Sequence, residues 1–151
     1  MKGYSIFIAG IIQGSIPGGA VHPQDYRGEL KQILQEHMPG ARVYCPIENH
    51  PDSLRYEDDK ARRVFFDHIE MVAASDCLIA FLPEASMGTA VEMYAAREAA
   101  VPVITISPLS GNWAVKFLSD VILADSEEFR AYVASGGLAK FLDKWHERQR
   151  P

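Results

Sequence analysis

The sequence between residues 77 and 99 reads CLIAFL (77–82), PEAS (83–86) and MGTAVEMYAAREA (87–99). The first six residues are all apolar, which is typical of a strand buried on both faces of a sheet. A turn with proline and serine follows, and residues from about Met87 to Ala99 then have the spacing of a helix. A strand that leads directly into a helix favours a parallel sheet, because parallel neighbours must be joined by a crossover connection.

The same alternation of strand and helix extends in both directions from this unit. Further strands are predicted at Tyr4–Ala9, Ala41–Cys45, Val101–Ile106 and Val121–Leu123. Helices are predicted at Asp25–His37, Asp58–Ala74 and Asn112–Leu118, and again over the carboxy-terminal residues. With 151 residues and no linker, the chain is predicted to be a single α/β domain, residues 1–151, with a five-stranded parallel sheet in a three-layer α/β/α sandwich.

Composition and charge exclude several classes of protein. The chain is 48% hydrophobic and 23% charged, so it is not disordered, and its net charge of −5 with no basic stripe argues against nucleic-acid binding. No apolar run is long enough to span a membrane. Cys45 and Cys77 both lie in apolar, strand-like segments, which fits reduced core thiols, and the protein is predicted to be soluble and cytoplasmic. No cofactor is predicted.

The loops after the strands are the places to search for a binding site, because ligands of parallel sheets bind beyond the carboxyl ends of the strands. These loops span Gly10–Pro23, Pro46–Tyr56, Pro83–Gly88 and Ser107–Asn112. The first begins GIIQGSIPGG and offers Gly10, Gln13 and Ser15 as candidate substrate contacts, although it matches no standard nucleotide-binding pattern.

Glu92 is the most informative residue of the predicted helix 87–99. Helical spacing places it on one face with small residues, namely Gly88, Thr89, Ala95, Ala96 and Ala99. Small side chains allow a helix to approach a sheet closely, so this face is predicted to point inward. A carboxylate there must be paired, protonated or directed into a cavity. The alternative is an exposed Glu92, or one that pairs with a cation in a purely structural contact.

Other polar residues have both a functional and a structural interpretation. Ser86 can cap the helix, and the free N–H groups of Met87 and Gly88 suit a phosphate or a sugar hydroxyl. His68 lies on the apolar face of its helix with Asp67 at the flank, as a catalytic residue or as a hydrogen-bonded core histidine.

His50, in the loop after the second strand, is a candidate contact for a base or sugar. No metal site is predicted, because the histidines lack the usual ligand spacing.

Residues 86–92 (SMGTAVE), preceded by the strand that starts at Asp76 and by a helix ending DHIE (67–70), resemble the nucleoside 2-deoxyribosyltransferase superfamily. That superfamily includes 2'-deoxynucleoside 5'-phosphate N-hydrolases. The resemblance implies a flavodoxin-like fold, with Glu92 as the nucleophile that attacks the anomeric carbon and Ser86 as a phosphate contact.

The chain also departs from the family pattern. Phe7 stands where the family has a tyrosine, His68 stands where it has a helix aspartate, and Ile11 stands where the phosphate branch has a serine, a place that Ser15 could fill. Either His68 or its neighbour Asp67 is expected to hydrogen-bond to Glu92, whose pKa burial should raise. Asn112, eight residues before Asp120, is similar to an asparagine that reaches the active site of a neighbouring subunit in the transferase branch. The resemblance therefore also implies a homodimer or larger homo-oligomer.

The predicted function is cleavage of the N-glycosidic bond of a (deoxy)nucleoside or nucleoside 5'-monophosphate, with transfer to water or to a second base. A cytokinin-type phosphoribohydrolase is an alternative, since Gly88, Thr89 and Glu92 also fit its motif. The others are a non-catalytic nucleotide-sensing module and a TIR-like enzyme that cleaves nicotinamide dinucleotides. The released base, the sugar, the need for a phosphate and the acceptor all remain open.

Overall fold

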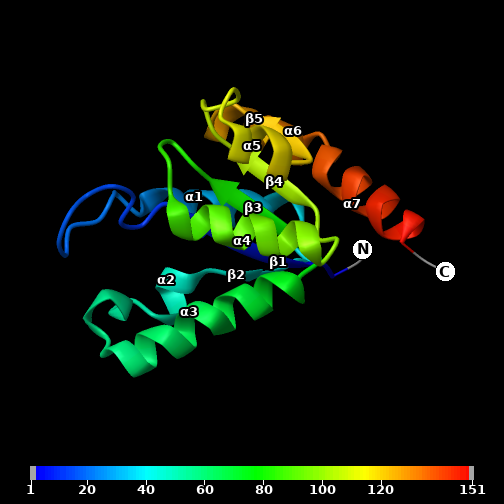
Figure 1. Ribbon diagram of the computed structural model, residues 1–151. Helices are drawn as coiled ribbons and strands as arrows, with labels where there is room; N and C mark the ends of the chain where they lie inside the picture. The colour runs from blue at the N-terminus through cyan, green and yellow to red at the C-terminus, as the bar shows by residue number, and fades with distance from the viewer. Residues whose placement is uncertain (1–2, 150–151) are drawn as a thin grey trace.

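The computed structural model describes residues 3–149, in which strands and helices alternate along the chain (Figure 1). The strands are β1 (Ser5–Gly10), β2 (Arg42–Tyr44), β3 (Cys77–Phe81), β4 (Val103–Ile106) and β5 (Val121–Leu123). The helices are α1 (Asp25–His37), α2 (Pro46–Asn49), α3 (Asp58–Ala73), α4 (Met87–Glu98), α5 (Trp113–Leu118), α6 (Ser126–Ala134) and α7 (Gly137–Arg148), with a 3-10 turn, η1, at Ser53–Arg55.

The five strands form one sheet, and every neighbouring pair in it is parallel, as predicted. Their order is β2-β1-β3-β4-β5, which is the flavodoxin-like order. The chain leaves β1 in one direction to form β2 and then returns to form β3 on the other side of β1. Ligands of such sheets bind at the carboxyl ends of β1 and β3, because the direction of winding reverses between these two strands.

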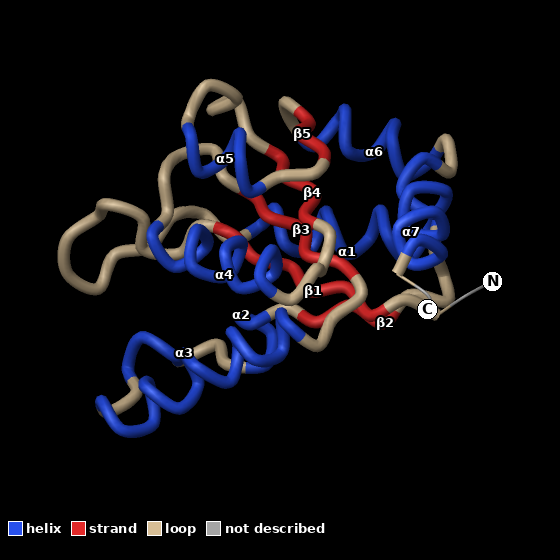
Figure 2. The backbone as a smooth tube through the Cα atoms, turned by 45° about the vertical axis from the view of Figure 1, so that its right-hand side comes forward, coloured by secondary structure: helices blue, strands red, loops and turns tan. Residues whose placement is uncertain are grey.

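Helices cover both faces of the sheet, which confirms the predicted three layers (Figure 2). Along β1, Ile6 and Ile8 point to the face covered by α1, α6 and α7. Phe7 and Ala9 point to the other face, against α3, α4 and α5. Successive strand residues therefore belong to two different cores, and this explains why the strands have no polar side.

Several predicted boundaries are shifted by one residue, and two differences are larger. Residues 46–56, predicted as a loop, contain α2 and the 3-10 turn η1, because Pro46 at the first helical position is preset for a helix. The fourth strand begins at Val103 rather than at Val101, because the Val101 amide donates to the Ala96 carbonyl at the end of α4. Pro102, which follows, has no N–H to give to a neighbouring strand.

Both cysteines are buried and free, in line with the prediction that they are core thiols. Burial raises the pKa of the Cys77 thiol, so this group remains protonated. Within residues 3–149, the helices are too short or too polar to cross a membrane.

Candidate active site

A pocket of about 320 Å³ lies at the carboxyl ends of the central strands. It is lined by the end of β1 and the loop that follows it, by α1, by residues between 46 and 56, by α3, and by the start of α4. Three of the four predicted loops contribute to this lining, and the loop Ser107–Asn112 does not. The pocket therefore lies where the order of the strands predicts a ligand.

The pocket brings together residues that the sequence analysis had singled out in separate segments. The candidates that line it are Gly10, Gln13, His68, Ser86, Met87, Gly88 and Glu92. Four other candidates lie outside this lining, namely Ser15, His50, Asp67 and Asn112. Ser15 and Asp67 are exposed, and the Asn112 side chain caps α5 by accepting from the Ala114 amide at 3.0 Å. A direct contact of these four residues with a ligand remains a prediction.

Glu92 lies on the flank of α4 that borders the pocket. The predicted inward face of this helix was wrong by about one position, because Thr89, Met93 and Ala96 are the buried residues, whereas Gly88 and Ala99 are exposed. Met93 has the largest apolar side chain available to this face, and its burial sets the rotation of the helix. Glu92 is consequently partly buried and faces the pocket rather than the sheet.

Glu92 forms no hydrogen bond and no ion pair within residues 3–149, so the expected hydrogen bond to His68 or Asp67 is absent. Burial raises the pKa of the Glu92 carboxyl to about 7, and the positive charge of Arg27 opposes this rise. A carboxylate with such a pKa changes its charge near neutral pH, which is typical of catalytic groups.

His68 is buried on α3, as its apolar neighbours predicted, and its Nε2 atom lies 3.0 Å from the hydroxyl of Tyr44. The ring of His50 packs against it with 5.4 Å between the ring centroids, and His50 Nδ1 in turn lies 3.1 Å from the Tyr56 hydroxyl. Burial, together with His50, lowers the pKa of His68. In the part of the chain that the structure describes, no three acidic, histidine or cysteine side chains gather as a metal site would require.

Tyr44 supplies a hydroxyl close to the strand position where the sequence lacks one. It is the register partner of Phe7 on the neighbouring strand, and the two rings stack at 5.3 Å between centroids. Phe7 is fully buried and also meets the edge of the His68 ring. A phenol is therefore present beside the Phe7 position, although it comes from β2 and contacts His68 rather than Glu92.

Arg27 is a site residue that the sequence analysis missed. It lies on α1, lines the pocket and is only 3% exposed. Helical spacing could have indicated that Arg27 is buried. It precedes Leu30 by three residues and Leu34 by seven, which places it on the buried face of the helix. An arginine on an apolar helical face is uncommon unless its charge has a use.

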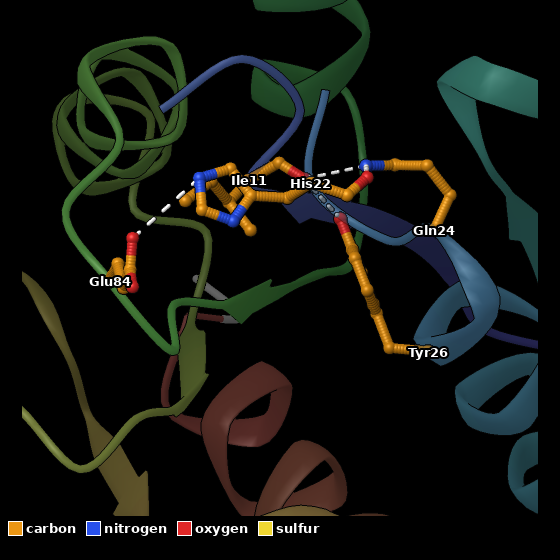
Figure 3. A network of polar contacts seen from close by, with 5 residues as sticks. All are labelled: Ile11, His22, Gln24, Tyr26 and Glu84. Carbon is orange, nitrogen blue, oxygen red and sulfur yellow. Dashed lines mark hydrogen bonds and ion pairs between the residues drawn. The ribbon is translucent and has the colours of Figure 1, made fainter. Parts of the chain in front are cut away.

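The loop after β1 is held in place by side chains around Ile11 (Figure 3). The Ile11 carbonyl accepts from the Tyr26 hydroxyl at 3.0 Å and from Gln24 Nε2 at 3.1 Å. Farther along the loop, His22 Nε2 lies 3.6 Å from Glu84 Oε2, in the turn after β3. These contacts tie the loop after β1 to α1 and bring it close to the turn after β3. Gly10, at the start of this loop, has no room for a Cβ atom because the Tyr26 ring occupies that space.

Ser86 caps α4, as predicted. Its Oγ accepts from the Thr89 amide at 3.3 Å and from the Thr89 hydroxyl at 3.0 Å. The amides of Met87 and Gly88 have no acceptor among residues 3–149 and belong to the pocket lining. The beginning of the helix therefore offers free N–H groups and positive potential to a ligand.

Ser86→Ala is expected to lower the free energy of unfolding by about 1 kcal/mol, because the first turn of α4 loses its cap. Urea denaturation followed by circular dichroism would measure this change. Ser110→Ala, in an exposed turn, is the matched control and should leave the midpoint within error. Equal midpoints for the two variants would contradict a stabilising cap at Ser86.

No known protein family and no curated protein matches the chain by sequence. Solved structures do share its fold. A conserved protein from Enterococcus faecalis V583 aligns with a TM-score of 0.63 at 20% identity, over 89% of this chain and 99% of that one. A 2-deoxyribosyltransferase from the psychrotolerant bacterium Bacillus psychrosaccharolyticus aligns with a TM-score of 0.62 at 20% identity, over 85% of this chain and 91% of that one.

A flavoenzyme, the NAD(P)H:(acceptor) oxidoreductase FerB from Paracoccus denitrificans, aligns with a lower TM-score of 0.55 at 13% identity, over 95% of this chain and 98% of that one. At such identities these likenesses establish architecture rather than chemistry. The chain thus has the nucleoside 2-deoxyribosyltransferase-like fold that residues 86–92 indicated, with a single α/β domain built on a five-stranded parallel sheet.

Proposed function

We propose that this protein is an N-glycosidase that cleaves the bond between base and sugar in a (deoxy)nucleoside or nucleoside 5'-monophosphate. One observation carries the proposal: among residues 3–149, Glu92 is the only carboxylate that lines the pocket at the end of β1. Breaking a glycosidic bond develops positive charge on the sugar, and a carboxylate can stabilise it or capture it covalently. The shared fold of the 2-deoxyribosyltransferase supports this chemistry.

In the proposed first step, the Glu92 carboxylate forms a bond to the anomeric carbon while the bond from that carbon to the base nitrogen breaks. The electron pair of the broken bond stays with the base, which takes a proton from solvent water. In the second step, water attacks the anomeric carbon and the Glu92 carboxylate departs. His68, whose lowered pKa favours the neutral ring, takes the proton that the attacking water releases and passes it to solvent. A second base in place of water would give a transferase.

The rest of the pocket suits the two ends of a nucleoside. The free amides of Met87 and Gly88, with Ser86 beside them, suit a sugar hydroxyl or a 5'-phosphate. Tyr56 and Phe65 also line the pocket and offer aromatic surface to a base. The homodimer or larger assembly, in which Asn112 would reach a neighbouring site, stays a prediction of the resemblance.

The test is incubation of the purified protein with ribo- and deoxyribonucleosides and their 5'-monophosphates, with and without an acceptor base, followed by chromatography of the free base. We expect base release from at least one of these classes, and a preference for monophosphates would assign Ser86 to the phosphate. Release from ribonucleoside monophosphates alone would favour the phosphoribohydrolase alternative. Release of nicotinamide from a dinucleotide would favour the TIR-like alternative, and binding without any release would favour a sensing module.

A further inference from the structure

Among the described residues, the pocket is lined by one basic and one acidic side chain, those of Arg27 and Glu92. His68 is the one histidine of this lining. The remaining lining residues are apolar, glycine or neutral polar. One cation and one anion therefore face the same cavity of about 320 Å³.

Arg27 is held by neutral acceptors. Its Nε donates to Gln24 Oε1 at 2.8 Å and its Nη2 to the Gly10 carbonyl at 3.1 Å. Its Nη1 donates to the Ile8 carbonyl at 3.3 Å and to Cys45 Sγ at 3.7 Å. Within residues 3–149, no carboxylate lies within ion-pair distance of this guanidinium. These bonds fix its position, but they leave its charge uncompensated in a buried place.

Glu92 likewise lacks a partner of opposite charge at ion-pair distance among the described residues, and its carboxylate accepts no hydrogen bond from them. The ionisable groups near it on other elements are Tyr26 and Arg27 on α1, His68 on α3, and Tyr56 in the loop before α3. Burial raises the pKa of the Tyr26 phenol, so this group stays neutral, and His68 is buried beside His50. Arg27 is thus the one permanent positive charge available to Glu92 in this pocket.

We propose that Arg27 is a positioning residue for the proposed reaction: its fixed charge favours the anionic form of Glu92 that attacks the sugar. The proposal rests on the function assigned to Glu92 above. Ionic attraction across a partly desolvated cavity does not need a direct hydrogen bond. The same charge favours the second step, in which the carboxylate departs from the anomeric carbon and regains its negative charge.

The direction of the pKa shift agrees with this arrangement, since burial raises the pKa of Glu92 and Arg27 lowers it. The hydrogen bonds of the guanidinium also fix where it stands. Four of its five N–H groups are used by β1, Gln24 and Cys45, which draws it toward the end of the strand.

The first experiment titrates Glu92 directly and needs no substrate. The carboxyl carbon of Glu92 is followed by ¹³C NMR in the wild type and in Arg27→Gln, and the signal is assigned by its loss in Glu92→Gln. The midpoint is expected to rise by about one pH unit in Arg27→Gln. Arg27→Lys keeps the charge and should stay within a few tenths of a unit of the wild type. Equal midpoints in all three proteins would overturn the proposal.

A second measurement covers the case in which Arg27→Gln does not fold. Arg27→Lys is the milder change, and the amine of its new side chain can be titrated by NMR with Glu92 present and in the Glu92→Gln background. Because coupling between two sites is reciprocal, the amine midpoint is expected to fall by about one unit when Glu92 is removed. An unchanged amine midpoint would contradict the charge pairing.

The pH profile of base release separates the proposed role of Arg27 from the proposed enzymatic function of Glu92. In Arg27→Gln the acid limb of the rate is expected to move to higher pH by the same amount as the Glu92 titration, whereas a purely structural defect would lower the rate equally at every pH. Shifted titrations in a protein that releases no base would keep the Arg27–Glu92 pairing and reject the enzymatic function. Base release with unshifted titrations would reject the role of Arg27 alone.

Discussion

Glu92→Gln is expected to reduce base release by at least about 10³-fold, because the amide cannot form the covalent intermediate and carries no charge to stabilise the sugar. The change is nearly isosteric, so the pocket keeps its shape and its affinity for a nucleoside. Base release by chromatography and binding by calorimetry would measure the two properties separately. The combination of lost turnover with retained binding is what distinguishes a nucleophile from a residue that only shapes the pocket.

Glu98→Gln is the matched control, since it makes the same chemical change at the exposed end of the same helix. Its rate should stay close to that of the wild type. The wild-type rate itself should fall as the pH drops through about 7, because protonation of Glu92 removes the nucleophile. A Glu92→Gln variant that still releases base at more than a tenth of the wild-type rate would exclude the proposed mechanism.

The same substitution is expected to stabilise the protein at alkaline pH. The pKa of Glu92 is raised from 4.5 to about 7 in the folded state, so folding favours the protonated carboxyl. This contribution is fully present below the unfolded pKa and is lost as the pH rises through about 7. At pH 9 the wild type holds a partly buried carboxylate that glutamine does not have. The expected gain for Glu92→Gln there is about 2 to 3 kcal/mol, allowing for the partial exposure of the side chain.

Urea denaturation at pH 4 and pH 9 would measure this difference. The advantage of Glu92→Gln should be near zero at pH 4 and largest at pH 9, while Glu98→Gln should show no such dependence on pH. If Glu92→Gln were no more stable than the wild type at pH 9, the carboxylate would be well solvated and its burial would not raise its pKa. A substitution that stabilises the fold but removes the activity is typical of a residue that serves the chemistry rather than folding.

Much of the architecture was predictable because it depends on local patterns. Parallel strands buried on both faces leave continuous apolar runs such as residues 77–82, and the helices between them have their own spacing and caps. The helix cap at Ser86 and the place of Glu92 at the pocket were also predictable, since both residues lie on one short segment of the chain. The alternation of strand and helix then places this segment at the carboxyl edge of the sheet.

The rotation of α4 was less predictable, because several of its residues are small and only packing against the sheet decides which of them are buried. Thr89, Met93 and Ala96 face the sheet in the structure, so Glu92 turns toward the pocket. The expected bond between Glu92 and His68 failed for a similar reason. The Nε2 atom of His68 instead lies within hydrogen-bond distance of the Tyr44 hydroxyl, and Tyr44 is 24 residues away in the sequence.

The sequence by itself determined the fold class, the edge of the sheet where the pocket lies and the carboxylate that stands there, because each of these depends on residues close together in the chain. Only the tertiary structure brought Arg27 into the same pocket as Glu92 and Tyr44 to His68. Those pairings depend on the order of the strands and on how the helices pack. Burial, which sets the charge of Glu92, exists only once the separate segments have come together.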